Sequence, residues 1–284
     1  AAPMSVRAVS DTPCRLGEGA LWHPLREQLF WVDILSRRLL TVEAGRERSW
    51  VFDDAPSALG WVDGATLLVA TEQALVTFDI ATGRRRPICP LEADDPRTRS
   101  NDGRADPWGG FWIGTMGWQA EPGAGAIYRY HRGDLRRLVD GVTISNAICF
   151  APGGTCAYYT DTREGRIMRQ SLDATDGWPA GPAETFVNLS GASFGPDGAV
   201  VDAEGCLCNA QWGAGRVARY DPEGRLVDVW PLPTPQTTCP AFGGADLRTL
   251  FVTSAAEGVD DPAAGRTFAI GTDVTGQAEH RVRL

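Results

Sequence analysis

The sequence predicts an all-β fold, a six-bladed β-propeller with four-stranded antiparallel blades that occupies residues 1–284 as a single domain. Two observations lead to this prediction: a strand pattern recurs six times along the chain, and long helical periodicity is missing. A hydrophobic content of 43% is enough for a sizeable core, and 33 Gly and 19 Pro suit many turns between short strands.

The recurring unit is a turn followed by a short strand rich in aromatic and β-branched residues. The six strands begin between 38 and 50 residues apart, at Leu29–Asp33, Leu67–Thr71, Phe111–Thr115, Ala157–Asp161, Leu207–Ala210 and Leu250–Ser254. A second strand soon follows, as at Ala126–Tyr130, Arg166–Gln170 and, with its turn, Arg216–Gly224. A period of this length with only strand signals is typical of propeller blades, and a β-sandwich of hairpins is the alternative.

The two ends of the chain are expected to share one blade. Ser5–Ser10 and His280–Leu284 both have the pattern of a short strand. Pairing them in one sheet would close the ring and remove the free sheet edges.

The charge composition excludes several classes of partner. Lys is absent, so all 27 positive charges are Arg, and they face 36 acids for a net charge of −9. There is no basic stripe for nucleic acid, no polybasic run for a membrane surface and no apolar stretch of roughly 18 residues. Seven scattered Cys and a start without a secretory pattern favour reduced thiols and a cytoplasmic location. We expect a monomer or a weak oligomer.

The repeat also predicts which polar residues meet on the axis. The innermost strand of each blade lines the channel and precedes the recurring strand, so we count back about ten to twelve residues from each. The resulting positions are Glu18, Ser57, Asn101, Asn146, Asp197 and Pro240, with Cys239 beside the last. Equivalent positions in a ring converge, so these side chains are expected to face one another at one mouth of the channel.

Two acids at such a point indicate a divalent cation. Glu18 and Asp197 would repel each other and are costly to bury unpaired, whereas one cation cancels both charges and Asn146 adds a neutral oxygen. An all-oxygen set suits Ca²⁺, Mg²⁺ or Mn²⁺, with Zn²⁺ and Fe(II) as further options, and so few ligands leave room for water or substrate. Read alone, Pro196-Asp197-Gly198 and Asn101-Asp102-Gly103 are also turn signals.

Five ordered segments carry a family resemblance, at Leu16–Trp22, Asn101–Pro107, Ile144–Asn146, Pro196–Gly205 and Ala241–Leu247. Together they resemble the SMP-30/gluconolactonase/luciferin-regenerating-enzyme-like family, and within it bacterial aldonolactonases such as xylono-, arabino- and gluconolactonases. The resemblance implies a six-bladed propeller that hydrolyses sugar lactones with one divalent metal. It assigns Glu18, Asn146 and Asp197 as metal ligands, and Asp197 also as general base.

The resemblance further implies that Arg99 and Asn101 bind substrate. The family often has an acid soon after Gly114-Thr115-Met116, and here Trp118 and Gln119 follow before Glu121. Glu121 or Trp118 is therefore expected to contact the substrate, and Trp118 and Trp212 are candidates for packing against a sugar.

The expected reaction is the opening of a sugar aldonolactone, a small-molecule substrate, to an aldonic acid. The metal would act as a Lewis acid and Asp197 would accept the proton of the attacking water. Two alternatives remain: a non-catalytic metal-binding propeller that regulates or scaffolds, and an esterase or phosphotriesterase-like hydrolase of the same fold.

Overall fold

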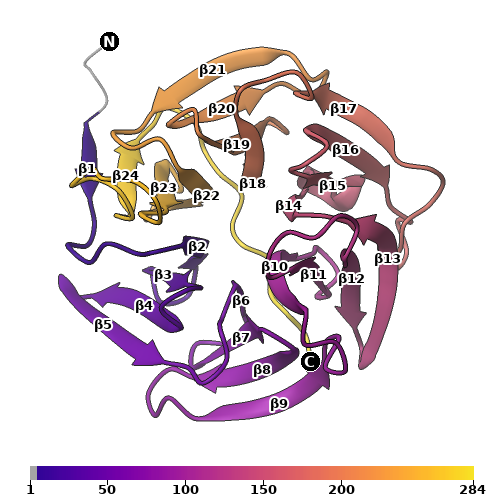
Figure 1. The fold of residues 1–284 in the computed structure, drawn as a ribbon, viewed down its shortest axis with the longest axis horizontal. Coiled ribbons are helices and arrows are strands. Elements are labelled where there is room, and N and C mark those ends of the chain that lie inside the picture. The colour runs from indigo at the N-terminus through magenta and orange to yellow at the C-terminus, as the bar shows by residue number, and fades with distance from the viewer. Residues whose placement is uncertain (1–4) are drawn as a thin grey trace.

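The computed structural model describes residues 5–284, which form a ring of six four-stranded antiparallel sheets around one axis (Figure 1). This confirms the predicted six-bladed propeller. Helical structure in these residues is limited to the 3₁₀ turn η1 (Pro152–Gly154), and none of it is long and apolar enough to cross a membrane. The start of the chain was one reason for the expected cytoplasmic location. Residues 1–4 of that start lie outside the part that the structure describes.

The first three blades follow one another along the chain, and each runs from the axis outward in sequence order. Blade 1 contains β2 (Gly17–His23), β3 (Gln28–Asp33), β4 (Arg38–Glu43) and β5 (Arg46–Val51). Blade 2 contains β6 (Ala58–Trp61), β7 (Thr66–Thr71), β8 (Ala74–Asp79) and β9 (Arg85–Pro90). Blade 3 contains β10 (Thr98–Ala105), β11 (Phe111–Gly117), β12 (Gly125–His131) and β13 (Asp134–Val142).

The next two blades repeat this order, and the sixth closes the ring. Blade 4 contains β14 (Ser145–Phe150), β15 (Cys156–Asp161), β16 (Arg166–Ser171) and β17 (Glu184–Asn188). Blade 5 contains β18 (Gly195–Val201), β19 (Leu207–Trp212), β20 (Arg216–Tyr220) and β21 (Leu226–Pro231). Blade 6 contains β22 (Thr237–Gly243), β23 (Thr249–Ser254), β24 (Phe268–Gly271) and, as its outer strand, β1 (Val6–Ala8).

The N-terminal strand closes the ring, as expected, but its partner differs from the prediction. β1 pairs antiparallel with β24, with Val6 opposite Ile270 and Ala8 opposite Phe268. The prediction that His280–Leu284 belongs to this blade is wrong. Those residues continue past β24 to the space between blades 2 and 3, where Val282 is fully buried with Ala58 of β6 and Phe111 of β11.

The hydrophobic core lies between neighbouring blades as a series of separate layers. Phe30 and Leu39 of blade 1 pack with Leu67 and Phe78 of blade 2, and similar clusters join the other neighbours around the ring. Because every blade is covered on both faces, its strands read as apolar runs rather than alternating patterns. This explains the recurring aromatic and aliphatic strands of the sequence.

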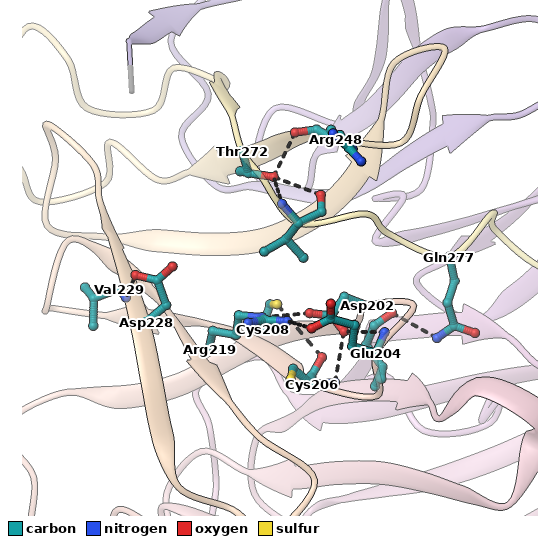
Figure 2. Close-up of polar contacts among 12 residues, drawn as sticks. Asp202, Glu204, Cys206, Cys208, Arg219, Asp228, Val229, Arg248, Thr272 and Gln277 are labelled. Carbon is teal, nitrogen blue, oxygen red and sulfur yellow. Dashed lines mark hydrogen bonds and ion pairs between the residues drawn. The ribbon is translucent and has the colours of Figure 1, made fainter. Parts of the chain in front are cut away.

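Aspartates at the ends of inner strands fix the turns that follow. Asp202 Oδ1 accepts the amides of Glu204 at 2.9 Å and Cys206 at 3.0 Å, while Oδ2 pairs with Arg219 Nε at 2.8 Å (Figure 2). Blade 3 repeats the arrangement with Asp106 and Arg129, whose side chains are fully buried. These pairs tie the first, second and third strands of a blade together.

Residues 272–284 form a segment that we call the C-terminal strap, and Figure 1 shows it in yellow crossing the middle of the ring. Gly276 N donates to Leu247 O of blade 6 at 2.8 Å, and Ala203 N of blade 5 donates to Thr275 O at 2.9 Å. Further along, Val282 N donates to Trp61 O of blade 2 at 2.9 Å. The strap therefore spans the channel from one side to the other.

Replacing Val282 with Ala should destabilise the protein by about 2 kcal/mol, because it leaves a cavity in a fully buried layer. Urea denaturation would measure the loss as a lower midpoint with an unchanged slope. Leu284→Ala is the matched control, since Leu284 is 53% exposed and should change stability by less than about 0.5 kcal/mol. Equal effects of the two substitutions would contradict this packing.

Candidate metal centre and active site

A cavity of about 300 Å³ opens at the mouth of the channel where the inner strands begin. It is lined by Leu16, Glu18, Arg99, Asn101, Met116, Ile144, Asn146, Thr162, Asp197 and Trp212. The four polar positions that the repeat predicted for blades 1, 3, 4 and 5 therefore do meet. Of the other two positions, Ser57 instead bonds Ser100 through its hydroxyl at 2.6 Å, and Pro240 lies within β22.

A one-residue bulge aims these side chains. The inner strands of blades 1, 3, 4, 5 and 6 each carry a register shift at the same height, whereas β6 of blade 2 pairs regularly. A bulge re-aims a side chain that would otherwise follow the alternation of the strand. Gly19 and Ala147, which follow Glu18 and Asn146, have the positive φ values of 62° and 57° that such a turn of the chain requires.

Asp197 and Asn101 lie inside β18 and β10, so the alternative reading of their sequences as turns is wrong. The Pro-Asp-Gly and Asn-Asp-Gly patterns mark bulges instead of hairpin ends. Both structures need a residue that tolerates an irregular backbone, which is why the same short sequences serve both.

Two aspartates outside the cavity hold the residues that lead into the site. Asp33, at the end of β3, accepts the amides of Arg15 at 2.9 Å and Leu16 at 3.0 Å, just before Glu18. Asp161, at the end of β15, accepts the amides of Thr143 at 2.8 Å and Ile144 at 3.0 Å, just before Asn146. Neither aspartate was predicted from the sequence, although an Asp ends both recurring strands.

Glu18 and Asp197 lie side by side and are only 4% and 6% exposed. Each accepts the amide of the following residue, Gly19 at 3.2 Å and Gly198 at 2.9 Å, and the two carboxyl groups are within hydrogen-bond reach of each other. A third carboxyl, that of Asp102, accepts Ile148 N at 2.9 Å and lies close beneath Glu18. Three acids thus share one buried point.

Their pKa values are raised as a result. Burial, followed by the charges of Asp197 and Asp102, raises the pKa of Glu18 well above its usual range. Burial raises the pKa of Asp197 to about 8 and that of Asp102 to about 6. Burial also lowers the pKa of Arg99 to about 10, against the opposing pull of Glu18. The acids therefore need either protons or a cation near neutral pH.

Two orientations of the Asn146 amide fit between Thr162 and Asp197, and they differ in where the Thr162 hydroxyl donates its proton. In the first orientation, the Thr162 hydroxyl donates its proton to Pro196 O at 2.7 Å, and its oxygen therefore accepts Asn146 Nδ2 at 2.8 Å. Oδ1 of Asn146 then lies 3.0 Å from Oδ1 of Asp197, which is repulsive unless a cation binds both oxygens. With the amide turned over, Nδ2 donates to Asp197 at this distance instead.

The residues present thus fit a divalent cation. They offer two carboxylates and an amide oxygen, the ligand chemistry of Ca²⁺, Mg²⁺ or Mn²⁺, and they are destabilised by one another without a positive charge. Thr162 supports the fit, because it turns the oxygen of Asn146 toward the acids when its own proton goes to Pro196.

Arg99 and Asn101 form the polar wall beside the acids. Arg99 Nη1 donates to Asn101 Oδ1 at 3.0 Å and to Ser100 O at 2.9 Å, and Asn101 Nδ2 donates to Ser145 O at 2.9 Å. Nε of Arg99 is buried and has no hydrogen-bond partner within residues 5–284. A buried donor of this kind is available to a ligand.

Trp118 and Glu121 lie outside the described lining of the cavity. The guanidinium of Arg99 lies 5.4 Å from the ring centre of Trp118, so Trp118 packs against a residue of the polar wall. Glu121 folds back on its own loop, where its carboxylate accepts Gln119 N at 3.3 Å. Their contacts with substrate stay predictions. Trp212 does line the cavity, with Leu16, Met116 and Ile144.

Residues 16–256 match the family described as the SMP-30/Gluconolactonase/LRE-like region, and all of the cavity lining falls within them. The chain belongs to this family. The match confirms the resemblance found in the sequence.

Several members of known name or structure align over nearly the whole chain. The 6-deoxy-6-sulfogluconolactonase of Pseudomonas putida is 34% identical over 97% of each chain. The L-arabinolactonase of Azospirillum brasilense is 35% identical over 96% of this chain and 94% of its own. The crystal structure of regucalcin from Agrobacterium tumefaciens, described as a calcium-binding protein, is 42% identical with a TM-score of 0.96, over 99% of this chain and 98% of its own.

Chelator-treated protein should lose stability as the pH rises from about 4 to about 8. In that window the folded state keeps the proton of Asp197, whose pKa is about 8, while the unfolded state has released it. Asp197→Asn should therefore raise the melting temperature of chelated protein at pH 8 and flatten the pH profile. A chelated wild type that is as stable at pH 8 as at pH 5 would contradict the raised pKa values.

Proposed function

We propose that this protein is a sugar lactonase that opens aldonolactones to aldonic acids and requires one divalent cation held by Glu18, Asn146 and Asp197. The observation that carries the proposal is the convergence of two buried carboxylates and an amide oxygen in one cavity, in a chain whose relatives include two named lactonases. Ca²⁺, Mg²⁺, Mn²⁺, Zn²⁺ and Fe(II) are the candidate ions.

The shape and polarity of the cavity suit a small ring with hydroxyl groups on one side. Its volume of about 300 Å³ is that of a small-ligand site. Arg99 and Asn101 form a polar wall, and Met116, Ile144 and Trp212 are apolar lining residues. A sugar lactone offers hydroxyl groups to the first set and carbon–hydrogen faces to the second, as sugar rings commonly do.

When bound, the cation supplies Lewis-acid stabilisation of the negative charge that develops on the lactone carbonyl oxygen. Asp197 is proposed as the general base that accepts the proton of the attacking water. One of its oxygens is held by Gly198 N at 2.9 Å, which fixes the carboxylate for proton transfer. Arg99, through its unpartnered Nε, and Asn101 would orient the ring.

A second candidate is a non-catalytic calcium-binding protein. The observation in its favour is that the regucalcin of Agrobacterium tumefaciens, which shares 42% of its residues with this chain, is described as calcium-binding. Both candidates bind an ion at the same acids, so only turnover separates them.

We also propose that the protein acts in the cytoplasm as a monomer or a weak oligomer. All seven cysteines are free thiols, which is in keeping with a reducing compartment.

Hydrolysis should depend on both the cation and Asp197. A panel of aldonolactones, assayed by acid release with and without chelator, should show turnover that chelation removes and added metal restores. Asp197→Asn should lower kcat by at least about a hundredfold, the usual contribution of a general base. Asp228→Asn, at an exposed position of β21, is the control and should leave turnover unchanged. Wild-type turnover in the Asp197 variant would rule out its role, and an inactive wild type would favour the calcium-binding candidate.

Arg99→Lys should raise KM by about tenfold with a smaller change in kcat, because lysine keeps the charge but loses the planar donor fork. Steady-state kinetics on the best lactone of the panel would measure the split. Arg97→Lys is the control, since Arg97 pairs with Asp95 at an exposed site. An unchanged KM would show that Arg99 does not bind the substrate.

A further inference from the structure

The C-terminal strap closes the mouth of the channel opposite to the cavity. The cavity is lined by residues near the beginnings of the inner strands, such as Glu18 and Asn146. The strap instead bonds to their far ends, because Gln277 Nε2 donates to Phe150 O at 3.0 Å and to Val201 O at 2.9 Å. Figure 2 shows Gln277 reaching from the strap toward the end of β18 beside Asp202. The two features therefore lie at opposite ends of one axis.

Glu279 of the strap reaches the axis and pairs with Arg104 of β10. Both side chains are almost fully buried, with 9% of Arg104 and 6% of Glu279 exposed. The remaining donors of Arg104 reach the carbonyls of Ile148 at 3.3 Å, Ala199 at 3.2 Å and Pro240 at 3.3 Å. One guanidinium from blade 3 thus spans the channel to blades 4, 5 and 6, with Glu279 as its acidic partner.

This pair lies directly beyond the acids of the proposed metal centre. Arg104 follows Asp102 by two positions, and the carboxylate of Asp102 lies within 4.8 Å of that of Glu18. From the cavity inward, the buried charges therefore run from Glu18 to Asp102, then Arg104, then Glu279. Negative, negative, positive and negative groups follow one another along the axis.

A buried ion pair is an expensive way to close a channel, since apolar side chains of similar size usually stabilise a fold as well or better. The layers between the blades of this protein use such side chains. Without Glu279, Arg104 would keep only Asp102 as an acidic neighbour on the axis, and its positive charge in a low-dielectric channel below a cation site would oppose binding of the cation. Glu279 removes that repulsion.

We propose that Glu279, by neutralising Arg104, sets the divalent-cation affinity of the site at the opposite mouth of the channel. Both residues are positioning residues, because neither lines the described cavity. The inference rests on the proposed function in one respect, namely that a cation binds at Glu18, Asn146 and Asp197. It adds that the strap, none of whose residues lines the cavity, controls this binding through charge.

The test is the dissociation constant for Ca²⁺ and for Mn²⁺, measured by calorimetric titration of the full chain after chelation. Glu279→Gln removes the negative charge paired with Arg104 and should weaken binding about tenfold, which corresponds to about 1.4 kcal/mol. Arg104→Gln leaves Glu279 uncompensated and should tighten binding by a similar factor. The double variant restores the balance and should bind within about threefold of wild type. Glu184→Gln, in an exposed ion pair with Arg169, is the control and should bind as wild type does.

Because the two single variants are expected to change the cation affinity in opposite directions, the test distinguishes an effect of charge from one of structural support. If the pair only held the strap in place, both single variants would weaken binding and the double variant would be the weakest. That result, or a Glu279→Gln variant with wild-type affinity, overturns the proposal. If Glu279→Gln does not fold, tightening in Arg104→Gln and its reversal in the double variant carry the test. A wild type that binds neither of these ions, nor Mg²⁺, Zn²⁺ or Fe(II), would overturn the proposed metal centre as well, whereas normal binding with unchanged variants overturns this inference alone.

Discussion

A one-residue bulge at the same height on five of the six inner strands decides where the polar side chains of this propeller point. On a regular strand, side chains alternate between the two neighbouring blades, and an acid there would be buried in an apolar layer without a partner. The bulges turn Glu18, Asn146 and Asp197 toward the axis instead. The blades provide rigidity and the bulges provide direction, so residues far apart in the chain can share one site.

Gathering acids on the axis makes that axis the polar part of an otherwise apolar fold. The layers between blades are held by aromatic and aliphatic packing, which depends little on pH or ions. The axis is held by hydrogen bonds and by the alternation of acids with Arg104. Burial raises the pKa values of Glu18, Asp102 and Asp197, so the protonation and ion content of the solution act on this part of the molecule first.

The sequence predicted the blades and the acids for the same reason, because a repeat fixes equivalent positions. It could not predict contacts that depend on how loops and ends fold back. Thr162 contacts both Asn146 and the Pro196 carbonyl of the next blade, and nothing in its own sequence marks it. Glu121 follows a family pattern, yet its loop turns the carboxylate onto its own backbone. His280–Leu284 looks like a strand, but the buried site for Val282 lies across the ring.

In a ring of repeats each unit contacts only its neighbours, so parts of such a protein can in principle unfold separately. The strap changes this, because its residues bond to blades 2, 3, 4, 5 and 6. If any of these blades unfolds, its bonds to the strap break, and the strap is then held less firmly against the other blades. Unfolding is therefore coupled across the ring, and the strap's contacts with distant parts of the chain add to the sequence separation that slows folding. The same thirteen residues that seal the channel thus tie five of the six blades to one another across the ring.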